Sequence, residues 1–124
     1  MKLNGKDFDR AVQRAIGRIP REIRRHLDNI LISVQQNPPP DLLEAMGLPP
    51  DEPLLGVYQG ASLLDRSTVN PPLYPDTIFI FQEPLEEMCD TLEELEEQIE
   101  ITVVHEVAHF LGIDEEKLIE LGYE

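Results

Sequence analysis

Apolar residues recur with helical spacing in several stretches of the chain. Between residues 8 and 19 they fall three and four positions apart with arginines between them, which is typical of an amphipathic helix. A longer apolar stripe begins after Thr91 and continues for about five turns, as far as Gly112. The chain is therefore predicted to form helices at residues 8–19, 20–27, 41–46, 91–111 and 114–121.

The longest predicted helix carries a signal at each end. Thr91 is followed three positions later by Glu94, the spacing of a capping box, in which the two side chains satisfy backbone amides at the helix start. Gly112 can adopt the left-handed conformation that ends a helix. Nine acidic residues lie between positions 83 and 100, and we interpret them as the solvated face of this helix.

Runs of β-branched and aromatic residues predict strands at residues 29–35, 54–58 and 76–82, with residues 61–64 as a return partner of the second strand. The last run, DTIFIFQ, is apolar on both faces, which places it in a sheet that helices cover on at least one side. Residues 65–75 contain several prolines and are predicted to form a loop.

The formal net charge of −15 is unevenly distributed. Residues 1–25 hold eight basic and three acidic residues, a net +5, which leaves −20 for the rest of the chain. A negative surface of this size repels phosphate backbones and anionic headgroups, so we expect neither nucleic acid nor a membrane as a partner. We expect the basic first helices to lie against the acidic body, and docking of an acidic partner on them is the alternative.

With 124 residues, the chain is expected to form a single domain, residues 1–124. No apolar run approaches the about 20 residues that a membrane-spanning helix needs. Cys89 is the single cysteine, so no disulfide can form within the chain. The first residues lack the apolar core of a secretory signal, and by default we expect a cytoplasmic location.

The residues most suited to chemistry lie inside the long helix, in the segment His105-Glu106-Val107-Ala108-His109. Residues four apart on a helix lie on the same face, so both imidazoles can reach one Zn²⁺ ion with Glu106 beside them. The spacing therefore predicts two metal ligands, His105 and His109, and a general base, Glu106.

A third ligand is expected nearby, because only 15 residues follow His109 and a distant downstream helix does not fit in them. In the extended form of this motif the third ligand falls six residues after the second histidine, which is Glu115. Gly112 allows the chain to leave the helix and double back at this point. Asp114 is the rival ligand, because a one-residue difference in the turn would exchange the two. No methionine follows Met88, so a Met-turn is absent.

Several segments carry a resemblance to a known family: DNILISVQQ, PPPDLLEAMG, LLGVYQG, DTIFIFQEPL and the terminal ITVVHEVAHFLGIDEEKLIELGY. Over residues 6–123 the chain resembles the small bacterial minimal zincin family, also called the zincin-like metallopeptidase family. The resemblance implies an α+β fold in which a small mixed β-sheet packs against the motif helix and the N-terminal helices. It also implies zinc held by two histidines and an acidic residue, more usually Asp where this chain has Glu115.

These residues predict a zinc-dependent metallopeptidase that hydrolyses peptide or protein substrates. Zinc lowers the pKa of a bound water to about 7, and Glu106 is expected to take its proton and later deliver it to the leaving amine. We expect zinc to be lost between about pH 6 and pH 4, because both imidazoles must be neutral to bind.

The strand at residues 76–82 is our candidate for pairing with an extended substrate at a sheet edge, through Thr77, Phe79 and Phe81. Tyr58 and Tyr123 are candidates for stabilising the oxyanion. Two other functions remain open: a zinc-binding interaction module with weak or no proteolytic activity, and a zinc hydrolase such as an amidase. A structural zinc site would normally have four protein ligands and would need no base, which favours the peptidase.

Overall fold

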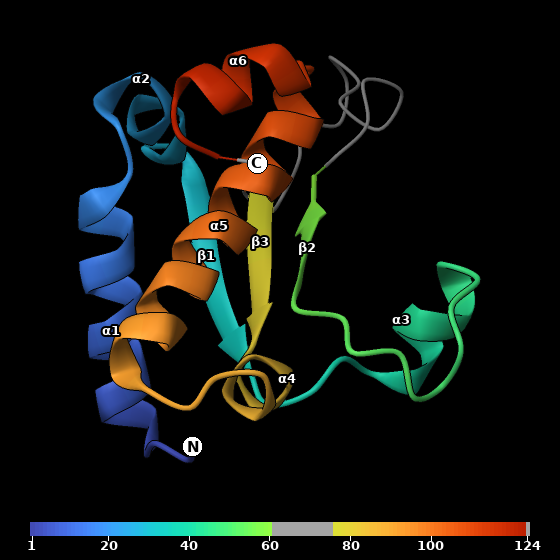
Figure 1. Ribbon diagram of the computed structural model, residues 1–124. Coiled ribbons are helices and arrows are strands. Elements are labelled where there is room, and N and C mark those ends of the chain that lie inside the picture. The colour runs from blue at the N-terminus through green and yellow to red at the C-terminus, as the bar shows by residue number, and fades with distance from the viewer. Residues whose placement is uncertain (61–75, 124) are drawn as a thin grey trace.

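A mixed three-stranded sheet lies at the centre of the fold in the computed structural model, which describes residues 1–60 and 76–123 (Figure 1). Its strands are β1 (Ile30–Gln35), β2 (Gly56–Gln59) and β3 (Asp76–Phe81), in the order β1-β3-β2. β3 runs parallel to β1 and antiparallel to β2. The predicted return strand at residues 61–64 and the predicted loop at 65–75 lie outside the described residues.

Helices α1 and α5 lie side by side over one face of this sheet (Figure 1). The helices of the described residues are α1 (Gly5–Arg18), α2 (Arg21–Arg24), α3 (Pro40–Ala45), α4 (Gln82–Glu87), α5 (Leu92–Leu111) and α6 (Glu115–Glu120), with a 3₁₀ turn, η1 (Arg25–Leu27). The predicted α+β class, with a small mixed sheet against the motif helix, is confirmed. No helix within residues 1–60 and 76–123 is long and apolar enough to cross a bilayer.

The main core lies between α1, α5 and the sheet. β3 contributes Ile78 and Ile80, both fully buried, and because strand residues alternate between faces, Phe79 and Phe81 lie on the opposite face. α5 also approaches β2 closely: a Cβ added at Gly56 would lie 2.7 Å from Thr102 Cγ2 and 2.9 Å from the Phe79 carbonyl oxygen. This contact fixes the motif helix directly over the sheet.

α5 starts and ends at the predicted residues. The Thr91 hydroxyl accepts from the Glu94 amide at 3.1 Å, while the Glu94 carboxylate accepts from the Asp90 amide rather than from Thr91. The buried stripe differs from the prediction at its ends, where Leu92 and Phe110 are exposed. In the middle of the helix more residues are buried than one stripe holds, because α5 contacts both α1 and the sheet; they are Leu95, Ile99, Thr102, Val103, Val104, Val107 and Ala108.

The acidic segment at residues 83–100 is not wholly solvated, and this part of the prediction is wrong. Glu86 lies on α4, a helix that the apolar pattern did not predict, and its side chain is 4% exposed. Its Oε2 accepts from the Leu3 amide at 2.7 Å and from Gln82 Nε2 at 3.2 Å. The buried carboxylate therefore ties the first residues of the chain to α4, an interaction between segments more than 80 residues apart.

Two other acids of this segment pair with the basic first helix, as the charge distribution predicted. Arg14 Nε pairs with Glu96 Oε1, and Arg18 Nε lies 3.2 Å from Glu100 Oε1. The arginines are half-exposed, so each pair contributes at most about 1 kcal/mol to stability. The pairs set how α1 lies along α5.

Candidate metal centre

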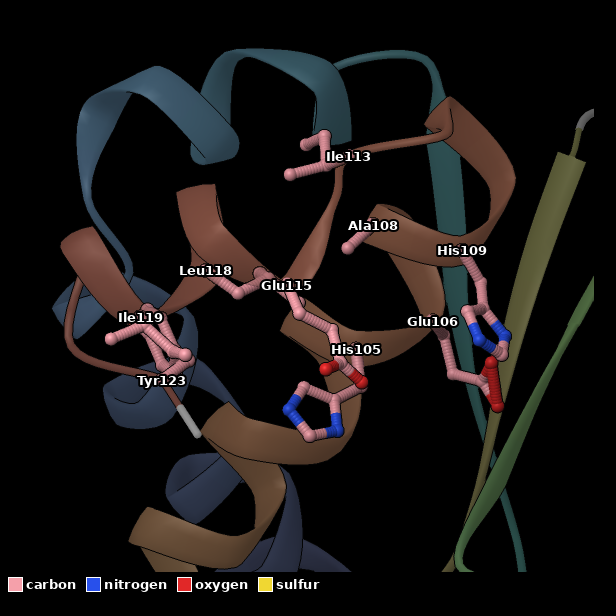
Figure 2. Close-up of a pocket in the computed structure, with 9 residues that line it drawn as sticks. All are labelled: His105, Glu106, Ala108, His109, Ile113, Glu115, Leu118, Ile119 and Tyr123. Carbon is pink, nitrogen blue, oxygen red and sulfur yellow. The ribbon is translucent and has the colours of Figure 1, made fainter.

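The last turns of α5 present the histidine pair at the wall of a pocket of about 540 Å³ (Figure 2). Val107 and Ala108 are buried, which fixes the helix face, while His105 and Glu106 are half-buried and His109 is exposed. The pocket is lined by His105, Glu106, Ala108, His109, Ile113, Glu115, Leu118, Ile119 and Tyr123. The structure thus brings both predicted histidines, Glu106 and Glu115 to one pocket.

The turn after α5 directs the chain back to this pocket. Gly112 has φ 72°, in the left-handed region, and its amide donates to the Ala108 carbonyl. The Ile113 amide donates to the same carbonyl at 2.9 Å. These bonds end α5 in the manner predicted for Gly112, and three residues separate α5 from α6.

Gly112→Ala should lower the free energy of unfolding by about 1 kcal/mol, because a Cβ is strained at positive φ even though open space surrounds this one. Gly17 is the matched control: it lies inside α1, and its added Cβ also meets nothing within 4 Å. Gly17→Ala should raise the same free energy by about 0.5–1 kcal/mol. Urea denaturation of the metal-free proteins measures both, and a stabilising Gly112→Ala would contradict the left-handed turn.

The structure separates the two rival acids. The Asp114 side chain caps α6, with its Oδ1 accepting from the Lys117 amide at 2.8 Å. Asp114 does not line the pocket, whereas Glu115 does. In Figure 2 the Glu115 carboxylate points toward His105, and Glu106 and His109 lie together beyond this pair. Asp114 therefore caps α6, and Glu115 lies in the pocket beside His105.

The donor set suits zinc in its chemistry. Two imidazoles one helical turn apart and a carboxylate from the next helix are ligands that zinc takes in catalytic sites. Among the described residues, no three metal-binding side chains already converge on one point. Convergence on one ion would need a change of side-chain rotamer, which exposed residues such as His109 undergo on the picosecond-to-nanosecond timescale.

Burial raises the pKa of the Glu106 carboxyl above its usual value, and the nearby His109 partly offsets this rise. Partial burial reduces the hydration of the carboxylate and so disfavours its charged form. A carboxyl group with a raised pKa accepts a proton more readily near neutral pH, which suits a general base.

In the metal-free protein Glu106→Gln should raise the free energy of unfolding at pH 7. A carboxyl whose pKa is raised by folding binds its proton more tightly in the folded state, so its contribution to stability is lost as pH rises through the folded pKa. Glutamine is neutral at every pH and does not show this loss. The difference in the free energy of unfolding between Glu106→Gln and wild type should therefore shrink toward pH 4. Urea denaturation in chelator at both pH values tests this, with the exposed Glu97→Gln as control.

The predicted substrate strand does not lie at a sheet edge, so that prediction is wrong. β3 is hydrogen-bonded to β1 on one side and to β2 on the other, which leaves no free edge for a peptide. Phe79 and Phe81 line a different pocket, together with residues of α3. Thr77, Phe79 and Phe81 alternate with the residues that face α5, and therefore lie on the sheet face away from the histidines.

Neither candidate tyrosine is positioned to stabilise an oxyanion. The Tyr58 hydroxyl donates to Asp76 Oδ2 at 2.9 Å, and its ring stacks on Phe110 with ring centroids 4.2 Å apart. The Tyr123 hydroxyl donates to Glu100 Oε2 at 2.7 Å. Both protons are bound by carboxylates of the protein itself.

Sequence reasoning missed the apolar part of the pocket. Ile113, Leu118 and Ile119 come from the turn and from α6, and they line the pocket beside the histidines and Glu115. Their spacing was visible in the sequence as an apolar side of the last short helix, but that pattern does not distinguish a core contact from a pocket wall.

Comparison with known proteins supports the resemblance seen in the sequence. The sequence pattern of a family described as zincin-like metallopeptidase matches residues 27–123, a narrower range than residues 6–123. A solved structure, a conserved hypothetical protein from T. thermophilus, is similar with a TM-score of 0.55 and 19% identity. The similarity covers 94% of this chain and 98% of that chain, and at this identity it shows a shared fold. No curated protein matches the sequence.

The family match spans the three strands and also α5, the turn after it and α6, whose residues line the pocket. This chain therefore belongs to the zincin-like metallopeptidase family.

Proposed function

We propose that the protein is a zinc-dependent peptidase in which His105, His109 and Glu115 hold the metal ion and Glu106 is the general base. The observation that carries the proposal is that one pocket is lined by all four of these side chains. The family to which the chain belongs supports the same reaction class.

Zinc, when bound, activates water and polarises the carbonyl that is attacked. The chain itself supplies proton transfer. Glu106 takes a proton from the attacking water and later delivers it to the leaving amine, which avoids expelling a strongly basic anion. Its half-buried position on the pocket wall leaves the carboxylate able to reach the reacting groups.

The apolar wall of the pocket is suited to the substrate. Ile113, Leu118 and Ile119 lie beside the metal-binding side chains, and they would contact a side chain next to the cleaved bond. An apolar side chain gains about 25 cal/mol for each Å² that it buries there. We therefore infer a preference for peptides with an apolar residue next to the cleaved bond.

The proposal is tested by measuring the zinc content of the purified protein and its cleavage of a peptide library, with products identified by mass spectrometry. We expect one zinc per chain, cleavage that stops in chelator, and recovery when zinc is added. One bound zinc with no cleavage would favour the interaction module, and cleavage of simple amides alone would favour the amidase. A protein that binds no zinc would refute the proposal.

The ligand assignment predicts opposite results for two neighbouring substitutions. Glu115→Ala should weaken zinc binding by about 10²-fold, because a ligand is lost. Asp114→Ala should leave zinc affinity within about twofold and lower the free energy of unfolding by about 1 kcal/mol, because the cap of α6 is lost. Competition with a chromogenic chelator and urea denaturation measure the two effects. The reverse pattern would make Asp114 the ligand.

A further inference from the structure

Helix α6 has little that holds it in place by itself. It has six residues, none of them buried, and helices this short are unstable in water without tertiary contacts. Leu118 and Leu121 are half-buried and pack against the core, and Lys117 makes an exposed ion pair with Glu22 at 3.4 Å. The position of Glu115 on the first turn of α6 therefore depends on how the helix is attached.

The strongest attachment lies just after the helix, at Tyr123. Its side chain is 6% exposed and belongs to the main core, although the residues before it are exposed or half-buried. Gly122 has φ 95°, and the Tyr123 amide donates to the Leu118 carbonyl at 2.8 Å, so the chain turns back under α6. The turn aims the tyrosine ring at α5.

The Tyr123 hydroxyl meets a carboxylate on α5 that is already held by α1. It donates to Glu100 Oε2 at 2.7 Å, and the other oxygen of that carboxylate lies 3.2 Å from Arg18 Nε. That second oxygen is buried and, among the described residues, has the Arg18 ion pair but no hydrogen bond, so the hydrogen bond to this carboxylate comes from Tyr123. Two helices, α1 and α5, and the segment that follows α6 thus meet at Glu100, five residues before His105.

The Tyr123 hydroxyl stays protonated, and therefore remains a hydrogen-bond donor to Glu100, at neutral pH. Burial first, and then the hydrogen bond to Glu100, raise the pKa of the Tyr123 hydroxyl above its usual value. The hydroxyl therefore keeps its proton throughout the neutral range. A hydrogen bond to a charged acceptor is stronger than an exposed ion pair such as that of Lys117.

We propose that Tyr123 is a positioning residue: by binding Glu100 it fixes α6 against α5 and so holds Glu115 across the pocket from His105. Tyr123 lines the same pocket as both of these residues. The inference rests on the proposed function in one respect, the role of Glu115 as a metal ligand.

The test is a double-mutant cycle on zinc affinity with the full chain. Tyr123→Phe keeps the ring and removes the hydroxyl, and it should weaken zinc binding by about tenfold, the lower end of the effect for residues that orient ligands. In a Glu115→Ala background the same change should alter zinc affinity by less than about twofold, because the ligand that it positions is already absent. Equal losses in both backgrounds would overturn the inference while leaving zinc binding established.

Two further variants separate positioning from general stability. Glu100→Gln keeps an acceptor oxygen for Tyr123 and should retain zinc affinity, whereas Glu100→Ala should reproduce the loss of Tyr123→Phe. Tyr58→Phe is the matched control, because it also removes a hydrogen bond from tyrosine to a carboxylate, and its effect on zinc affinity should be the same with and without Glu115. A loss in Glu100→Gln as large as in Glu100→Ala would contradict the inference.

A metal-free measurement completes the test. Amide hydrogen exchange at residues 118–121 should be about tenfold faster in Tyr123→Phe than in wild type, while the buried middle of α5 should stay protected. Unchanged exchange in α6 would overturn the inference. If the wild type binds no zinc, the proposed function fails, and the role of Tyr123 in holding a metal ligand fails with it.

Discussion

Glu106→Gln should lower the rate of peptide cleavage by about 10²- to 10⁴-fold while the protein still binds one zinc ion. Glutamine has the shape of glutamate but cannot accept a proton and return it to the leaving amine. His105 and His109 are unchanged, so metal affinity should stay within a few-fold of wild type. The measurement is kcat on a peptide selected from the library, together with the zinc content of each preparation.

Glu97→Gln is the matched control for this loss. It removes the same charge from the same helix, at an exposed position away from the pocket lining. Its cleavage rate should equal that of wild type, because the long-range effect of one surface charge is small in water. Full activity in Glu106→Gln would show that a different group accepts the proton.

His109→Ala should weaken zinc binding by at least about 10²-fold and abolish cleavage. Structural zinc sites with four protein ligands contribute about 10–16 kcal/mol, so one ligand accounts for a few kcal/mol. His109 is exposed, and its substitution should leave the metal-free protein folded. The dissociation constant is obtained by competition with a chromogenic chelator at pH 7, and thermal unfolding checks the fold.

His26→Ala serves as the control, because His26 lies in η1 and does not line the pocket. It should bind zinc as tightly as wild type.

Zinc should leave the wild-type protein as pH falls from about 6 to 4, since protons compete with the metal for imidazole nitrogen. Full retention of zinc at pH 4, or unchanged affinity in His109→Ala, would exclude this pair as ligands.

The parts of the site that could be predicted are those that depend on local spacing. The histidine pair, Glu106 and the cap at Thr91 all follow from residue types three or four positions apart on one helix. The end of α5 at Gly112 follows from the conformational freedom of glycine, and the structure confirms it, because Gly112 has a φ of 72°. These features need no knowledge of what packs against α5.

The errors concern contacts between distant segments. The strand at residues 76–82 is apolar on both faces, but which strands flank it depends on pairing with residues 30–35 and 56–59, and this pairing makes β3 central. Glu86 was expected in water because its neighbours in sequence are acidic. It is buried because the amide of Leu3, 83 residues earlier, needs an acceptor at that point.

The third ligand shows where local reasoning stops. Spacing alone left Glu115 and Asp114 open, because a shift of one residue in the turn exchanges them. The fold places the two acids differently, since the Asp114 oxygen caps α6 whereas the Glu115 side chain lines the pocket. The order of residues was enough to determine the motif, the helix that carries it and the turn that ends it. Tertiary structure decided the central place of β3, the burial of Glu86 and which of the two acids lines the pocket, because each depends on groups that only folding brings together.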